Sequence, residues 1–529
     1  MNQENPFNPQ LSNKAKEHLL QGLELDCQTV QADMEDLTSL IHDPDAPWVK
    51  SQVPTVETLY HAFMDSAGLS DDVASRPWWF PGGTKAWIVN ITGMASSSKV
   101  VEVLLNPLSR EAKIIEETLI HQDGSTLTEL LQSILPATQV TPTADLAEVS
   151  YGIASGQSGL FIEGVTIAYL IDTAGPKERP VGKTSVENVL RGPLDAFNEN
   201  IDTSVALLRR RVHEPSFRIK ILRVGTGTKT RVAVCSIGSR VKPEVLGQVE
   251  LAISKIDVDA ITDSGQLGQL MNPGWLHVFP LAISTERPDR AVMALFDGRV
   301  VVVVDTSPFV LILPSVYVDF FQAMEDLYVP WVPATGLRIL RLVADHIAAL
   351  APALYVAVAS FNPGILTPPF ELVMASARAL VPFSPLVEAI LVLVLTDILI
   401  EAAIRSPKVV GNAVPIVGGI IIGDVLTKTH LASEVMLVAG ALAAITQFTA
   451  AEPSISTVER LNKYWFLIWA GFLGFFGLMI ATVLELAYMA NLKSVGTPYF
   501  SPVAPFQWRE ALNAKLALPP RWRPRKVVE

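Results

Sequence analysis

Three carboxylates interrupt an otherwise apolar segment, PLVEAILVLVLTDILIEAAI, at residues 385–404. They are Glu388, Asp397 and Glu401. Asp397 and Glu401 lie one helical turn apart, and Glu401 precedes Arg405 by four residues, the spacing of an ion pair near a helix end. Asp397 has no cation at that spacing. An ionisable group inside a membrane span costs roughly 2.5–3.5 kcal/mol on insertion scales and usually faces a bundle interior or a pathway. These residues therefore predict a pathway or a subunit seam, with a structural hydrogen bond as the alternative for Asp397.

A second polar set belongs to the glycine-rich segment VVGNAVPIVGGIIIGDVL. Asn412 and Asp424 bracket this segment, and Pro415 and Gly418–Gly419 lie inside it. Broken backbone at membrane depth is tolerated only against protein or a water-filled cavity. We therefore add Asn412, Pro415 and Asp424 to the candidate pathway or seam residues, and we expect this segment to be irregular or re-entrant.

The elements that must hold these residues are apolar segments of the length that a spanning helix needs, which is about 20 residues. The last of them, YWFLIWAGFLGFFGLMIATVL, is apolar on every face, which favours a membrane over the alternative of buried helices in a large soluble core. Residues 338–490 thus predict an all-α membrane domain with four to five spans. The candidate segments are about 338–360, 385–404, 409–427, 431–451 and 463–488.

Basic residues predict the orientation of this domain. Arg338 and Arg341 precede the first span, so the N-terminal half should be cytoplasmic. The basic C-terminal tail, residues 491–529, would lie outside after five spans but inside after four spans and one re-entrant segment. Before the first span, residues 316–337 include Phe320 and Phe321 and predict an interfacial linker, with an ordinary linker as the alternative.

The N-terminal half repeats itself. GTKAWIVNITG begins at Gly83 and GTKTRVAVCSIG at Gly227, an offset of 144 residues. A second pair of similar segments begins at Ala154 and Phe296, an offset of 142 residues. Two pairs at nearly one spacing predict two small α/β modules of similar fold, at about 54–185 and 186–315. Residues 1–53 then form an N-terminal extension.

A helix is predicted between the repeats, within 193–212, and it ends in Arg209, Arg210 and Arg211. Cations are favoured at a helix C-terminus, so a solvated cap is one interpretation of this triplet. The other is a contact with a neighbouring subunit or with lipid headgroups.

Composition and motifs exclude several functions. A formal net charge of −12, with no long basic cluster in the N-terminal half, disfavours nucleic-acid binding. GTGTKT is not a phosphate loop, because Thr precedes its Lys and the string precedes a strand. There is no GxSxG, HExxH or CxxC, and the eight histidines are scattered. We therefore expect neither an enzyme nor a metal site or cofactor. Charged residues make up only 18% of the chain, which again favours a membrane protein.

Several motifs follow one another in a characteristic order: VLRGPLDAFNENI, GTKTRVAV, KIDVDAITDSGQL, STERPDRAVMALFDGRVVVVVDTSPFVLILPS, PFSPLVEAILVLVLTDILIEAAIRSPK, GNAVPIVGGIIIGD and GTPYFSPVAPF. Their order resembles the GerA family of spore germination proteins. The resemblance covers roughly residues 80–529. It implies a multi-pass protein of the spore inner membrane, with the N-terminal half on the core side. It also implies a homo-oligomer that forms a nutrient-gated ion channel, with a transporter-like B subunit and a lipoprotein C subunit as partners.

The sequence departs from the family in the RGPLDAF motif and after it, where Thr203-Ser204 stands in place of Thr-Asn. RGPLDAF stands where the family usually has RGPREGF, so Leu194 replaces an arginine and Ala196 a glycine. This leaves open a full receptor subunit or an accessory paralogue of the SpoVAF type, which would amplify ion release without sensing nutrient. A solute transporter is a third alternative, although the membrane segments lack the internal repeat that many transporters carry.

Overall fold

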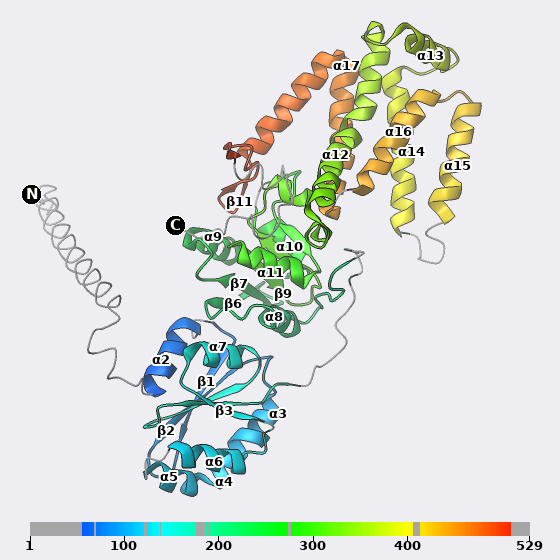
Figure 1. Cartoon of the computed structure of the whole chain (residues 1–529). Coiled ribbons are helices and arrows are strands. Elements are labelled where there is room, and N and C mark those ends of the chain that lie inside the picture. Colours follow the sequence, from blue (N-terminus) through cyan, green and yellow to red (C-terminus); the bar gives the residue numbers. More distant parts are fainter. Residues whose placement is uncertain are drawn as a thin grey trace, which may run out of the picture.

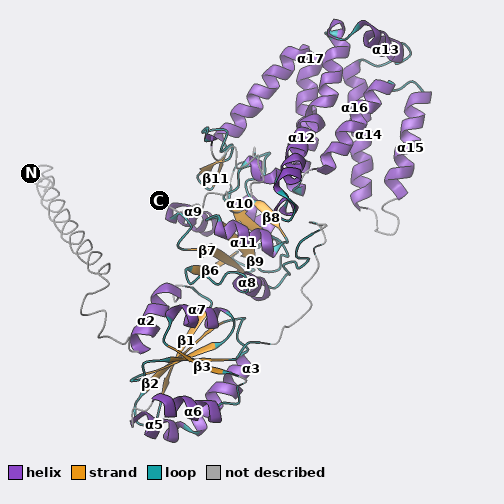
Figure 2. Cartoon of the chain, viewed as in Figure 1, coloured by secondary structure: helices purple, strands orange, loops and turns teal. Residues whose placement is uncertain are grey.

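The computed structural model describes residues 56–508, except for gaps at 68–69, 121–123, 138, 176–183, 185–186, 188–190, 273, 275–276, 406–412 and 450. The predicted extension, residues 1–53, lies outside the described residues, and so does most of the basic tail. Two α/β modules and a set of helices follow one another along the molecule (Figure 1). Strands are confined to the modules and to a small ribbon beside them, and the C-terminal half is helical (Figure 2). The predicted fold class is confirmed.

The first module is a five-stranded antiparallel sheet with helices on both faces. Its strand order is β1-β2-β4-β5-β3. One face packs on α2 and α7, and the other packs on the helices between β2 and β3. The elements are α2 (Val56–Ala67), β1 (Val73–Trp79), β2 (Lys85–Ile91), α3 (Ser97–Lys99), the π-helix η1 (Val100–Leu105), α4 (Asn106–Arg110), α5 (Ala112–Ile120), α6 (Gly124–Ile134), β3 (Val140–Thr143), α7 (Leu146–Ala154), β4 (Ser158–Ile162) and β5 (Ala168–Ile171).

The second module repeats this topology. Its strand order, β6-β7-β9-β10-β8, is the first order shifted by five strands, so the two sheets have the same connectivity. The central strand β9, VVVVV, is buried on both faces, as expected for a sheet covered on both sides. The elements are α8 (Ile201–Arg209), β6 (Phe217–Val224), β7 (Thr230–Ile237), α9 (Pro243–Ser254), α10 (Ser264–Leu270), β8 (Ile283–Thr285), α11 (Pro288–Phe296), β9 (Val300–Val304) and β10 (Val310–Leu313).

The described part of the C-terminal half consists of six α-helices, α12 to α17, with short elements between them. Two of the described helices, α12 and α17, are long and apolar enough to cross a membrane by length and composition. The elements are η2 (Tyr317–Phe321), η3 (Met324–Leu327), α12 (Trp331–Ser360), η4 (Pro363–Ile365), α13 (Pro368–Arg378), α14 (Pro385–Arg405), α15 (Ala413–Lys428), α16 (Glu434–Thr446), η5 (Gln447–Thr449), α17 (Pro453–Asn491), β11 (Lys493–Ser494) and β12 (Thr497–Pro498).

Helix α17 is a hairpin rather than one straight rod. Gly474 has φ 62° and ψ −140°, which breaks the helix into arms at 453–473 and 475–491. The arms run back along each other, because Asn462 donates to Glu485 at 2.6 Å and the Trp465 indole donates to the Ala481 carbonyl at 3.4 Å. The chain therefore returns to the second module, where β11 and β12 lie (Figure 1).

Two sequence expectations are corrected here. The glycine-rich third segment is a continuous helix, α15, and the break falls in the last segment instead. Pro415 lies in the first turn of α15, where a missing N–H costs no helical hydrogen bond. Gly418 permits close packing, because a Cβ there would stand 2.6 Å from the Leu399 side chain of α14.

The interfacial linker is also different from the expectation. Phe320 and Phe321 do not face a membrane, because both are buried in the core of the second module. They belong to a 3-10 turn, η2, and the long helix α12 begins at Trp331, inside the range predicted as linker. Amphipathic spacing alone did not distinguish a protein core from a lipid surface.

Candidate functional site

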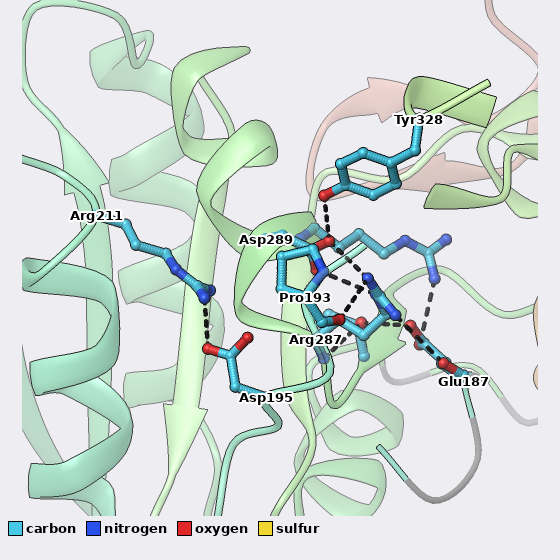
Figure 3. A network of polar contacts seen from close by, with 9 residues as sticks. Glu187, Pro193, Asp195, Arg211, Arg287, Asp289 and Tyr328 are labelled. Carbon is cyan, nitrogen blue, oxygen red and sulfur yellow. Dashed lines mark hydrogen bonds and ion pairs between the residues drawn. The ribbon is translucent and has the colours of Figure 1, made fainter. Parts of the chain in front are cut away.

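A buried arginine fixes the end of the segment that joins the two modules. The Arg287 side chain is 1% exposed and precedes α11. Its Nε and Nη2 donate to the two Asp289 oxygens at 3.1 and 2.7 Å. Nη1 and Nη2 also donate to the backbone carbonyls of Glu187 and Pro193, at 3.4 and 3.2 Å (Figure 3). One guanidinium thus holds the backbone of the joining segment against the second module.

A second arginine ties that segment to the helical half. Arg290 Nη1 lies 2.7 Å from Glu452 Oε2 and 3.4 Å from Glu187 Oε1. Glu452 directly precedes α17, and its side chain is 2% exposed. Burial raises the pKa of Glu187 to about 7, against the attraction of Arg290 and with the repulsion of Glu452. The two carboxylates share the positive charge of Arg290, so the negative charge of Glu187 is only partly neutralised.

Tyr328 completes this cluster, which we call the seam network: Glu187, Arg287, Asp289, Arg290, Tyr328 and Glu452. The Tyr328 hydroxyl donates to Asp289 Oδ2 at 2.6 Å (Figure 3), and burial raises its pKa to about 12. The Tyr328 ring leaves no room beside Gly192, where φ is +129° and a Cβ would stand 2.8 Å from the ring. The glycine of RGPLDAF is therefore required by the packing of this network.

The arginine triplet at the end of α8 divides into three different roles. Arg209 is 3% exposed and binds Asp72 of the first module with Nε and Nη2, each at 2.8 Å. It also donates to the Phe217 carbonyl at 3.0 Å. Arg209 is thus a joint between the modules, and the expected subunit or lipid contact is wrong for it because the side chain is enclosed. Arg211 pairs with Asp195, and Arg210 is exposed.

Asp397 has partners that local spacing does not reveal. Lys463 Nζ lies 2.6 Å from Oδ1, and the Tyr464 hydroxyl donates to Oδ2 at 2.6 Å, both from α17. The Lys463 side chain is 1% exposed, so this lysine depends on Asp397 for its counter-charge. Glu401 pairs with Arg405 at 2.7 Å, as its spacing predicts, and is 3.5 Å from Arg460 of α17.

Glu388 is the centre of a buried polar cluster in the helical half. It is fully buried, and Tyr355 of α12 and Arg378 of α13 each donate to its Oε2 at 3.0 Å. The backbone N–H and hydroxyl of Ser433, the residue before α16, donate to Oε1 at 2.7 and 2.6 Å. One carboxylate therefore joins four elements, with both oxygens satisfied.

The remaining candidates do not join these clusters. Asp424 is exposed and pairs with Lys428 of its own helix at 2.7 Å. Pro415 stands in the first turn of α15, and Asn412 lies outside the described residues. Our sequence reasoning missed Glu187, Arg290 and Glu452. The string STERPDR was the available signal for Arg290, because two arginines and four other polar side chains stand where a buried helix begins.

The described contacts link the parts of the molecule to one another. Buried ion pairs connect the first module to the second, the second to α17, and α17 to α14. Separating such a pair in apolar surroundings is costly, so each pair fixes the packing of its elements while they stay dry. In the part of the chain that the structure describes, no three His, Cys, Asp or Glu side chains are grouped so as to hold a metal ion.

Comparison with known proteins gives the family. The family model of the Bacillus/Clostridium GerA spore germination protein matches residues 61–526. Spore germination protein KA of Bacillus subtilis is 32% identical over 82% of this chain and 78% of its own length. The membrane protein YfkQ of the same organism is 28% identical over 88% of both chains. The N-terminal domain of the A subunit of the Bacillus megaterium germinant receptor GerK3 matches 50% of this chain and 96% of its own, with 24% identity and a TM-score of 0.37. This chain belongs to the GerA family of spore germination proteins.

Proposed function

We propose that this chain is the membrane subunit of a germinant receptor in the spore inner membrane, acting as an oligomeric, nutrient-gated ion channel. A transporter-like B subunit would bind the nutrient, and a lipoprotein C subunit would complete the complex. Opening would release ions during germination. It would be a population shift, which requires that the nutrient-bound partner prefer the open state.

One observation carries this proposal: the second module and the helical half share a single hydrophobic core. The core that contains Phe217 and Val301 of the sheet also contains Ile455, Val458 and Met489, from both ends of the α17 hairpin. Close-packed cores transmit displacement, because they deform little. A partner that moves the second module would therefore move the α17 hairpin.

The charge distribution supports the core-side placement of the soluble half. Arg338 and Arg341 lie in the first turns of α12 beside the second module, and both bind Asp326, at 3.2 and 2.8 Å. Arg405 ends α14 and Arg460 follows the start of α17, and Glu401 links them. These cations gather at one end of the helices, which the positive-inside rule assigns to the cytoplasmic side.

The pathway assignment of Asp397 is tested by flux through the purified full chain in liposomes, alone and with its partner subunits. Asp397→Asn alone would leave Lys463 buried without a counter-charge, so a lost signal would not distinguish folding from conduction. The informative variant is Asp397→Asn with Lys463→Gln, which removes both charges and nearly keeps the shapes. We expect normal oligomer yield with altered flux or selectivity.

The matched control is Lys220→Gln with Glu250→Gln, an exposed pair 2.6 Å apart on the second module, which should leave flux unchanged. Normal flux in the Asp397/Lys463 variant would show that the pair is structural. Flux that depends on nutrient only when partners are present supports the receptor. Flux that ignores nutrient supports the accessory alternative, and no flux under any condition contradicts the channel.

A further inference from the structure

Two buried carboxylates face each other where the helices meet the second module. Asp345 lies on α12 and Glu459 on the first arm of α17, and they are 8% and 5% exposed. Their carboxyl groups lie within range of a direct electrostatic interaction with each other. Neither belongs to the seam network or to the candidate residues that the sequence suggested.

The pair lacks donors for most of its oxygens. Among the described residues, no donor reaches either oxygen of Glu459 or Oδ1 of Asp345. Oδ2 of Asp345 accepts from the Tyr317 hydroxyl at 3.1 Å. His346 Nδ1 is 3.7 Å from the same oxygen, but its ring is 57% exposed and Nδ1 is 2.8 Å from the Leu342 carbonyl.

The surrounding groups do not supply the missing positive charge. Glu485, on the second arm of α17, adds a further carboxylate, which is held by Asn462 at 2.6 Å. Tyr499 is fully buried within electrostatic range of Asp345, and its hydroxyl has no hydrogen-bond partner in the described part of the chain. Arg460 is next to Glu459 in sequence but points to Glu401 of α14, 3.5 Å away.

Two interacting carboxylates that are this deeply buried and lack hydrogen-bond donors need a cation to balance their charge. We propose that Asp345 and Glu459 form a site for one small cation, either a proton or a hard metal ion, at the junction of α12, the α17 hairpin and the second module. The atoms available to bind a metal ion are all carboxylate oxygens. Oxygen ligands select hard cations such as Ca²⁺, Mg²⁺ or K⁺ over softer transition metals. Because the pair supplies only two carboxylates, water would provide the other ligands of a metal ion.

Occupancy of this site would control the contact between two helices. With the cation present, the pair attracts and holds α12 against the first arm of α17. Without it, two buried negative charges repel across the same contact. The change would reach the second module through Tyr317, whose hydroxyl donates to Asp345. This inference concerns cation binding at rest and does not depend on whether the chain conducts ions.

The test is thermal unfolding of the full-length chain in detergent between pH 5 and pH 9, in metal-free buffer and then with added K⁺, Mg²⁺ or Ca²⁺. If a proton occupies the site, the native state holds a proton that the unfolded state has already lost, so stability falls as pH rises. A metal ion that binds only the native state should raise the melting temperature at high pH by about 2 °C or more at a hundredfold excess over its Kd.

Glu459→Gln should flatten both responses, because the neutral side chain needs no cation. Asp345→Asn removes the other carboxylate of the pair and is expected to have the same effect. It serves as the test if Glu459→Gln impairs folding. Glu434→Gln, an exposed carboxylate in the first turn of α16, is the matched control and should respond like the wild type. Since Glu187 also titrates in this range, the measured quantity is the difference from wild type.

The outcomes separate the two sources of charge. A metal-dependent rise at high pH that both variants lose identifies a metal ion. A pH slope that the variants lose, with no metal effect, identifies a proton. Identical pH and metal responses in the wild type and both variants would overturn the site.

Discussion

The two α/β modules share one strand order but are attached to the molecule in different ways. The first module meets the second through a small polar joint. Arg209 binds Asp72, Ser70 donates a hydroxyl to that carboxylate, and Asp71 accepts from the Ile221 N–H at 2.7 Å. The second module instead shares its hydrophobic core with residues from η2 and from both ends of α17.

The difference indicates which repeat is free to move. Two core clusters of the first module cover its own sheet, and nearly all of their residues belong to that module. One cluster of the second module cannot be completed without the helical half. The first module is therefore an appended domain on a polar joint, while the second is a structural part of the helical half. The predictions below test this contrast, from the largest expected effect to the smallest.

The largest effect is expected from Arg290→Met. This change leaves Glu187 and Glu452 buried beside each other without their cation, and breaking a buried ion pair in this way costs about 3–5 kcal/mol. Unfolding of the full chain in denaturant should show the second module and the helices destabilised together, in one transition. Arg231→Met is the control, because its partners Asp202 and Asp305 are partly exposed and such pairs contribute about 1 kcal/mol or less. Equal losses in the two variants would contradict the role of the seam network.

Arg209→Met should have a different signature. It leaves Asp72 buried without its partner, so the joint between the modules should open. We expect limited proteolysis to release the first module as a folded fragment, with the second module and helices still resistant. Arg210→Met, an exposed neighbour on the same helix, should leave the digestion pattern unchanged. Loss of both modules at the same protease concentration would show that the joint is not the weak point.

The repeat and the apolar segments could be predicted from sequence because both depend on local pattern. The two GTK strings mark the turns before β2 and β7, which occupy equivalent positions in the two sheets. Asp397 and Lys463 are 66 positions apart, and Arg290 and Glu452 are 162 apart, so no spacing rule connects them. The role of each glycine in the helices could not be predicted from sequence either. Gly418 serves close packing against Leu399, whereas Gly474 adopts a backbone conformation that other residues rarely reach.

Gly192→Ala should lower the free energy of unfolding by about 1–3 kcal/mol, because alanine is strained in this backbone conformation. The contact of its Cβ with the Tyr328 ring should lower it further. Gly83→Ala isolates the first cost, because Gly83 has φ +97° in the first module and a Cβ added there would meet nothing within 4 Å. Thermal unfolding of both variants should show the larger loss at Gly192. Rescue of Gly192→Ala by Tyr328→Leu would identify the ring as the cause, and equal losses at the two glycines would refute the contact.

The smallest effect concerns pH. Burial raises the pKa of Glu187 from 4.5 to about 7. The native state therefore binds a proton that the unfolded state has lost, and the stability contributed by Glu187 falls as pH rises from about 4.5 to 7. Glu187→Gln should flatten this part of the melting profile.

Glu214 gives the opposite control. Burial opposes ionisation there, but hydrogen bonds from Ser239 and Ser216 outweigh it and lower the pKa of Glu214. The stability that Glu214 contributes to the native state is present above about pH 4.5 and is lost as pH falls. Glu214→Gln should therefore reduce the difference between neutral and acidic conditions. Two variants that shift the profile in the same direction would contradict the burial argument for Glu187.

The hairpin at Gly474 sets an order of events during synthesis. Tyr499 lies in the core of the second module, and its backbone pairs with Tyr317, so that core stays open until the chain has been made as far as Tyr499. Domains generally fold as units from the N-terminus while the chain grows. The first module can finish early, whereas the second must wait until the α17 hairpin has formed and carried the chain back. Tyr499 thus closes a core whose first strand was made more than 250 residues earlier.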